Sequence, residues 1–68
     1  MVDLAYRYVE IVGVSDKGLD DAIRRAVEEA YRESKQISWF EVSEIRGSVK
    51  EGKVKEYQVV VKVGYKVS

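Results

Sequence analysis

Two side chains in this 68-residue sequence have the chemistry to hold a planar ligand, and they are Trp39 and Gln58. Trp39 is the sole tryptophan, in the segment ISWFEVSEIRG, which alternates large and polar side chains as a half-buried strand does. The alternation places Trp39 on the opposite side of that strand from Phe40 and Val42. A large ring that faces away from a small domain's core needs a partner, which could be another subunit or a planar ligand.

Gln58 carries a side-chain amide, which donates and accepts hydrogen bonds at once and so suits a heterocycle edge with both kinds of group. The alternative interpretation of Gln58 is an ordinary polar residue on an outer strand face. The alternative for Trp39 is a side chain packed in an interface between subunits. Arg46, Lys66 and Arg7 are surface cations. Lys66 falls close to Trp39, where it could reach an anionic tail of a stacked ligand.

The residue inventory offers no apparatus for catalysis. The sequence contains no histidine and no cysteine, no nucleophile beside a base and no nicotinamide-binding fingerprint. Disulfides and structural zinc are therefore excluded as means of stabilising so short a chain. We expect no catalytic residue and no metal site, and hence a binding protein rather than an enzyme.

Four segments must position these side chains. The pattern predicts one helix, with Ser15 or Asp16 as N-cap, and three strands in the order β-α-β-β. A helical crossover and then a tight hairpin favour an α+β fold, whose antiparallel-type sheet has the order 1-3-2 and the helix on one face. The expected bounds are 2–14 for the first strand, 18–34 for the helix, and 37–49 and 53–67 for the other strands.

Both faces of the first strand are substantially apolar. Val9 and Ile11 share one face, while Tyr6, Tyr8 and Val12 share the other. The chain has only enough helix to cover one side of a sheet, so the second apolar face indicates a subunit interface. The alternative is that tyrosines simply sit well on an exposed strand.

The hairpin fixes the register if Glu51 and Gly52 form a two-residue loop. The count then places Lys66 beside Ile37. The expected outer-face pairs are Ile45 with Gln58, Ser43 with Val60, Glu41 with Lys62 and Trp39 with Gly64, and the pairs under the helix are Val42 with Val61 and Phe40 with Val63. A bulge near Arg46 and Gly47 would shift this count.

Trp39 and Gln58 share the outer face in this register but lie six residues apart along the sheet, which at about 3.3 Å per residue is roughly 20 Å. One small ring system cannot easily touch both within a subunit. A ligand that uses both must lie between subunits, most economically about a two-fold axis.

The sequence closely resembles the dodecins, which are small flavin-binding proteins. The resemblance covers nearly the whole chain as one domain, 1–68, and is carried by VEIVGVS, GLDDAI, WFEVSEIRG and VKEYQVVVKVG. It implies a hollow homododecamer in which flavins at each two-fold axis are stacked between symmetry-related tryptophans. The implied function is flavin storage and sequestration, in which aromatic contact quenches the photochemistry of the flavin.

The resemblance also implies residue roles. Trp39 would stack on the flavin, and Gln58 would hydrogen-bond the pyrimidine edge of the isoalloxazine. The other positions that match the flavin surroundings are Arg46, Arg7, Ser38 and Lys66. The implied cofactor is a flavin, with FMN ahead of riboflavin and FAD. Some relatives also bind coenzyme A, for which Arg32 and Lys35 are the candidate contacts.

Charge and hydropathy narrow the range of partners. Twelve basic residues balance twelve acidic ones, which argues against the broad positive field of a nucleic-acid-binding protein. No segment has the length and apolarity to span a bilayer, and we expect a cytoplasmic protein. Two rival readings remain at this point: a structural oligomeric shell with Trp39 as interface packing, and a partner- or nucleic-acid-binding module that stacks on Trp39.

Overall fold

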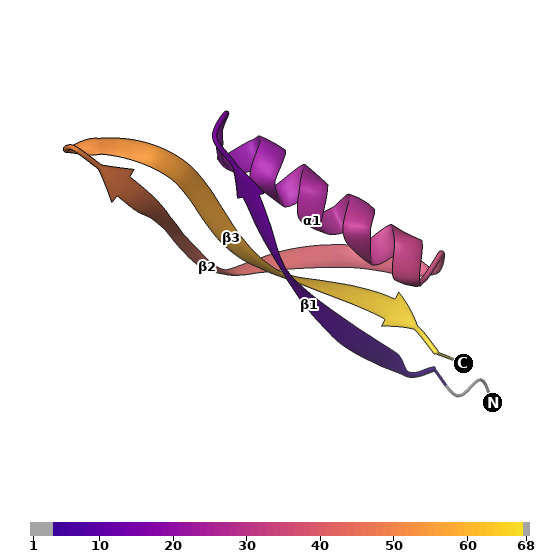
Figure 1. The fold of residues 1–68 in the computed structure, drawn as a ribbon. Helices are drawn as coiled ribbons and strands as arrows, with labels where there is room; N and C mark the ends of the chain where they lie inside the picture. Colours follow the sequence, from indigo (N-terminus) through magenta and orange to yellow (C-terminus); the bar gives the residue numbers. More distant parts are fainter. Residues whose placement is uncertain (1–3, 68) are drawn as a thin grey trace.

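The chain folds as one helix packed on one face of a three-stranded sheet (Figure 1). The computed structural model describes residues 4–67. Its elements are β1 (Tyr6–Ser15), α1 (Leu19–Glu33), β2 (Ile37–Lys50) and β3 (Lys53–Lys66). The sheet order is β1-β3-β2, and β3 runs antiparallel to both neighbours. The expected α+β class, strand order and position of the helix are confirmed, while residues 2 and 3 of the expected first strand lie outside the described residues.

The hairpin between β2 and β3 turns on Glu51 and Gly52, as expected. Their φ angles are 53° and 77°, and two successive positive φ angles are what a two-residue primed turn needs to match the twist of its strands. Lys50 therefore pairs with Lys53. The end of this hairpin projects beyond α1, at the side of the molecule away from both termini (Figure 1).

Small side chains bring the helix close to the sheet. Because alanines recur every four residues on one side of α1, that side has no bulky group to hold it away from the strands. At Gly13 of β1 the approach is so close that a Cβ atom would lie 1.9 Å from the backbone oxygen of Ala22. The fully buried core consists of Ala22, Ala26 and Ala30 of α1 and Val59, Val61 and Val63 of β3.

The helix lies over β1 and β3 and largely misses β2. Phe40 and Val42 are on the helix side of the sheet, as expected, but they are 51% and 37% exposed. The expectation that both pack under the helix is therefore wrong, because one narrow helix covers only two of the strands. Ile23, Val27 and Phe40 instead line an open groove between α1 and β2.

The helix begins differently from the expectation. Gly18, and neither Ser15 nor Asp16, occupies the N-cap position, and it makes no side-chain cap bond. Ser15 is 2% exposed, and its hydroxyl accepts a hydrogen bond from the Lys17 N–H at 2.9 Å. It is therefore used in the turn that joins β1 to the helix, rather than as a cap.

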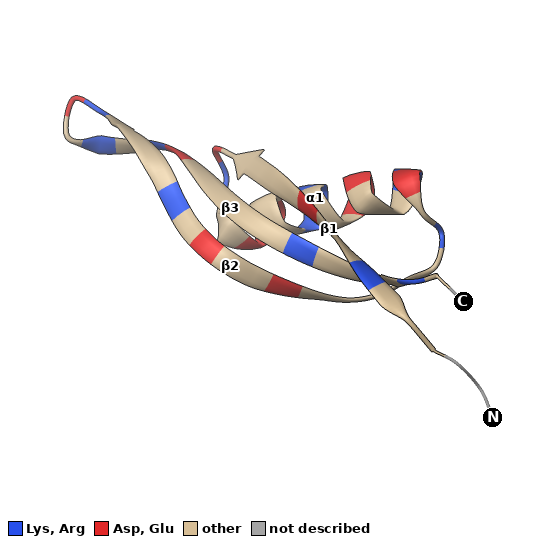
Figure 2. Ribbon diagram, turned by 90° about the horizontal axis from the view of Figure 1, so that it is seen from below, with Lys and Arg blue, Asp and Glu red and all other residues tan. Residues whose placement is uncertain are grey.

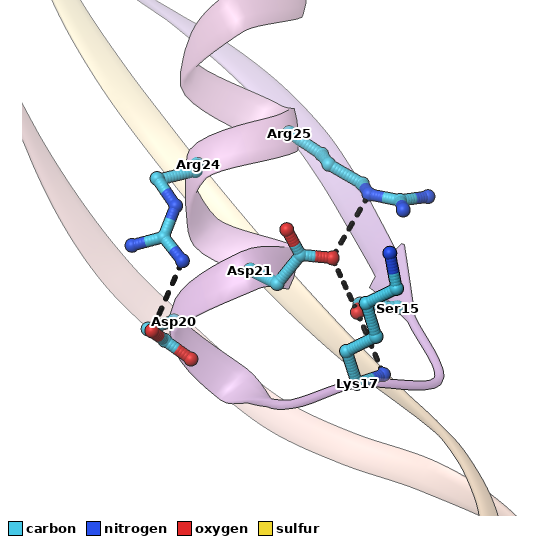
Figure 3. A network of polar contacts seen from close by, with 6 residues as sticks. All are labelled: Ser15, Lys17, Asp20, Asp21, Arg24 and Arg25. Carbon is cyan, nitrogen blue, oxygen red and sulfur yellow. Dashed lines mark hydrogen bonds and ion pairs between the residues drawn. The ribbon is translucent and has the colours of Figure 1, made fainter.

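Asp21, in the first helical turn, ties the helix to β1 (Figure 3). The Ser15 hydroxyl donates to its Oδ2 at 2.6 Å, and Arg25 Nε lies 3.1 Å from the same oxygen. The bond from Ser15 is the main cause that lowers the pKa of the Asp21 carboxyl. Burial opposes it, and the neighbouring Arg25, Lys17 and Arg24 charges lower the pKa further. The folded chain therefore favours the ionised form of this carboxyl.

The expected register holds next to the turn and again over Trp39–Val42 of β2, but not at Ile37, which pairs with Tyr65. Near the turn, Lys50 pairs with Lys53. At the far end, the confirmed pairs are Val42 with Val61, Glu41 with Lys62, Phe40 with Val63 and Trp39 with Gly64.

The middle of β2 departs from the count because of two bulges. An extra residue on β2, Ser43, and an extra residue on β3, Lys55, shift the pairing of Glu44–Ser48 by one position and then restore it. The expected pairs of Ile45 with Gln58 and Ser43 with Val60 are therefore wrong. Ile45 pairs with Val59, and Arg46 takes its place opposite Gln58.

Candidate functional site

Trp39 forms an aromatic platform on the outer face of the sheet. Its indole lies across Gly64 of β3, where a Cβ atom would come within 2.5 Å of Trp39 Cε2. The ring reaches β1, where its centroid is 5.1 Å from that of Tyr6 and 5.8 Å from that of Tyr8. The two tyrosines meet the indole tilted and edge-on, which are favourable aromatic geometries. The tryptophan is held in place and is still 40% exposed.

The tyrosine that meets Trp39 edge-on is itself anchored. The Tyr8 hydroxyl donates to Glu41 Oε1 at 2.5 Å, and Glu41 pairs with Lys62 across the sheet, as expected. This bond to a carboxylate raises the pKa of the Tyr8 phenol above its ordinary value, against a smaller opposite effect of its contact with Trp39. The phenol remains a donor to Glu41 throughout the neutral range.

A second group of polar side chains lies on the same face, further along β3. Arg46 Nε donates to Gln58 Oε1 at 2.9 Å, and Arg46 Nη1 lies 2.6 Å from Glu44. Gln58 Nε2 donates in turn to Glu56 Oε2 at 2.8 Å. Strict alternation would turn Arg46 toward the helix; the bulge at Ser43 brings it to the outer face instead.

The platform and this polar group do not meet within one subunit. Trp39 is opposite Gly64, and Arg46 is opposite Gln58, so six residues of β3 separate them, or roughly 20 Å at about 3.3 Å per residue. The separation expected between Trp39 and Gln58 is therefore present. A ligand of ordinary size that touches both must receive them from two copies of the chain.

Of the other candidate residues, Lys66 and Ser38 lie near Trp39, and Arg7 does not. Lys66 pairs with Tyr6 of β1 and not with Ile37, which pairs with Tyr65 because Ser38 forms a further bulge. Lys66 still lies on the outer face beside the platform, and Ser38 precedes Trp39 directly. Arg7, opposite Tyr65, falls on the helix side of the sheet, away from Trp39.

The two candidate contacts for coenzyme A are engaged within the chain. Arg32 Nη1 lies 2.6 Å from Glu29 Oε1, and Lys35 Nζ lies 4.0 Å from the centroid of the Tyr31 ring. Both lie at the C-terminal end of α1 and in the segment after it.

Lys and Arg positions alternate with Asp and Glu positions along the strands (Figure 2). Within residues 4–67 there is no group of three or more acidic, histidine or cysteine side chains that could hold a metal ion. Over the same residues, no helix is long and apolar enough to cross a membrane.

The sequence reasoning missed the supporting residues of both groups. Tyr6 and Tyr8 were placed on the outer face but not beside Trp39, although pairing β1 with β3 sets Tyr8 opposite Gly64. That pairing could have been counted in advance. The roles of Glu44 and Glu56 could not be predicted in this way, because their contacts with Arg46 and Gln58 depend on the bulges at Ser43 and Lys55.

Comparison with known proteins agrees with this architecture. The sequence model of the Dodecin family matches residues 5–68. A dodecin of Thermus thermophilus is 48% identical over 62 residues, which cover 91% of this chain and 90% of the relative.

Solved structures are similar over almost the whole chain. A crystal structure of the tt0972 protein from Thermus thermophilus has a TM-score of 0.90 at 45% identity and covers 97% of each chain. Dodecin from Streptomyces coelicolor has a TM-score of 0.91 at 38% identity, with 100% of this chain and 97% of the other covered. The helix on one face of a 1-3-2 sheet is thus shared with solved dodecins, and the chain described here belongs to the dodecin family.

Proposed function

We propose that this chain stores flavin by stacking it on Trp39 at two-fold interfaces of a homododecamer. The observation that carries the proposal is the exposed indole, which lies across Gly64 in contact with Tyr6 and Tyr8. Such a ring can cover one side of an isoalloxazine without rearrangement. By analogy with bases stacked on aromatic side chains, the contact is worth about 1–3 kcal/mol.

The polar and charged side chains of the outer face also suit a flavin. Gln58 and Arg46 offer donors and an acceptor of the kind that a pyrimidine edge requires, and Lys66 beside the platform offers a positive charge to a phosphate. We therefore place Trp39, Lys66 and Ser38 on one copy and Gln58 and Arg46 on another around the same ligand. Arg7 would have to reach the ligand across a subunit boundary.

Assembly into a dodecamer is part of this proposal. Phe40, Ile23 and Val27 line an uncovered groove, and Tyr8 and Val12 leave the opposite face apolar. A chain of 68 residues gains stability by covering such surfaces with further copies of itself. FMN is the expected ligand, because Lys66 can engage its phosphate. Coenzyme A is not proposed, since Arg32 and Lys35 are already engaged.

The role assigned to the bound flavin is passive. Close contact with an indole quenches an excited flavin, so a stacked flavin is withdrawn from light-driven side reactions. No residue of the outer face is proposed to transfer a group or a proton. We infer a cytoplasmic flavin store and not an enzyme.

Titration of the assembled protein with FMN and riboflavin tests the proposal through flavin fluorescence. We expect strong quenching, and Trp39→Ala weakens binding by about 10- to 100-fold, which corresponds to the stacking energy above. Tyr31→Ala is the matched control, because it removes another exposed aromatic ring from the helix. Flavin fluorescence that stays unchanged at saturating wild-type protein contradicts the proposed function.

A further inference from the structure

The side-chain amide of Gln58 is held between two charged groups of opposite kind. On one side the Arg46 guanidinium, which can only donate, bonds to Gln58 Oε1 at 2.9 Å. On the other side the Glu56 carboxylate accepts the bond from Gln58 Nε2 at 2.8 Å. Arg46 is fixed in turn by Glu44 at 2.6 Å.

These partners leave the amide one orientation. Turning it over would set the Nε2 donors against the Arg46 donor and Oε1 against the Glu56 carboxylate, so that two charge-assisted hydrogen bonds would become two repulsive contacts. After both bonds are made, Oε1 keeps one free lone pair and Nε2 keeps one free hydrogen. The residue therefore presents an acceptor on the Arg46 side and a donor on the Glu56 side, in a fixed order.

We infer that Glu56 is a positioning residue that makes Gln58 selective for a ligand edge with the matching order of donor and acceptor. The inference rests on the proposed function, in which that edge is the pyrimidine edge of a flavin. Its ring N3–H would meet Gln58 Oε1, and an adjacent carbonyl oxygen would meet Nε2. Glu56 touches no ligand atom in this arrangement and acts only through the amide.

The consequence is a difference between ligands rather than a general loss of binding. Without the carboxylate, Arg46 alone holds the amide. The amide is then less firmly oriented, and a ligand that uses it must immobilise it further on binding. A ligand without a hydrogen for Oε1 makes no hydrogen bond to that oxygen. Its affinity therefore does not depend on how firmly the oxygen is held. Damage to the sheet or to the assembly would weaken both ligands alike.

The test compares riboflavin with N3-methylriboflavin, in which a methyl group replaces the N3 hydrogen. Both are titrated against wild type, Glu56→Gln, Glu56→Asp and, as a matched control for charge, Glu51→Gln at the hairpin turn. We expect wild type to bind riboflavin at least tenfold more tightly than the methylated analogue. Glu56→Gln should weaken riboflavin three- to tenfold and leave the analogue unchanged, whereas Glu56→Asp and Glu51→Gln keep most of the preference.

The outcomes separate this inference from the proposed function. If wild type binds neither flavin, the proposed function fails. If wild type binds riboflavin but shows no preference over the analogue, or if Glu56→Gln keeps the wild-type preference, the role of Glu56 is overturned and flavin binding stands. Light scattering and circular dichroism of each variant establish that the compared proteins share one assembly and one fold.

Discussion

The two faces of the sheet each contain a glycine that admits a close neighbour, and the neighbours differ in kind. On the helix side, Gly13 faces the backbone oxygen of Ala22. On the outer side, Gly64 faces the indole of Trp39. Backbone in a helix cannot move alone, whereas an exposed side chain can turn away. One face is thus organised for folding, and the other for presenting a ring.

The side chains around the two glycines follow the same division. The helix side is packed with alanine and valine that are almost fully buried, so that small volumes decide how closely the layers approach. The outer side carries tyrosine, tryptophan and charged residues that remain accessible. Identical substitutions at the two glycines should consequently have different effects.

The largest effect is expected from Gly13→Ala. The new Cβ atom would lie 1.9 Å from the backbone oxygen of Ala22, so the helix must move off the sheet. Overpacking of this kind costs about 3 kcal/mol or more. Urea denaturation at a fixed protein concentration measures the loss. A midpoint indistinguishable from that of wild type would show that the helix side yields as easily as the outer side.

A smaller effect, of another kind, is expected from Gly64→Ala. Here the clash is with an exposed ring at 2.5 Å, which can swing outward, so we expect the free energy of unfolding to change by less than about 1 kcal/mol. The displaced indole stacks poorly, and riboflavin should bind about tenfold more weakly, a change of about 1.4 kcal/mol. The comparison breaks if Gly64→Ala unfolds the protein and Gly13→Ala leaves its stability intact.

The smallest effect concerns the contact of Asp21 with Ser15 at the edge of the helix side. Because the pKa of Asp21 is lowered in the folded chain, its stabilising effect is fully present above the ordinary value of 3.8 and is lost as the pH falls through the lowered value. The difference in unfolding free energy between wild type and Asp21→Asn should therefore be constant near neutral pH and shrink in acid.

Denaturant midpoints measured across the acid range provide the check on Asp21. Ser15→Ala keeps the carboxylate but removes the hydroxyl that donates to it. It should reproduce most of the loss of pH dependence. Parallel curves for wild type and Asp21→Asn would mean that this contact has no influence on acid stability.

Much of the fold was accessible from the sequence because each step used local chemistry. The count from the Glu51 and Gly52 turn paired Trp39 with Gly64 correctly, because the bulges at Lys55 and Ser43 cancel before that pair. Which strands the helix covers could not be predicted from such local patterns. Phe40 and Val42 have the pattern of core residues, but whether a helix reaches them depends on its placement across the strands.

In the candidate site, too, some positions followed from local sequence patterns and others did not. The face of Trp39 followed from alternation, and its distance from Gln58 followed from the register counted from the hairpin turn. The position of Arg46 did not, since it depends on two bulges whose sequence signals are weak and whose effects cancel at the strand ends. The flavin contacts proposed for Arg46, Ser38, Lys66 and Arg7 came from resemblance to the family and remain predictions.

The bulges of β2 also determine where this strand tolerates insertions and deletions. Ser43 has no partner of its own on β3, so its deletion would remove a bulge and leave every neighbouring pair in place. Deletion of a paired residue such as Ile45 would instead turn one part of the strand over and place Arg46 and Trp39 on opposite faces of the sheet. Changes in chain length should therefore be confined to the bulge positions, Ser38 and Ser43, while the segments between them keep their length.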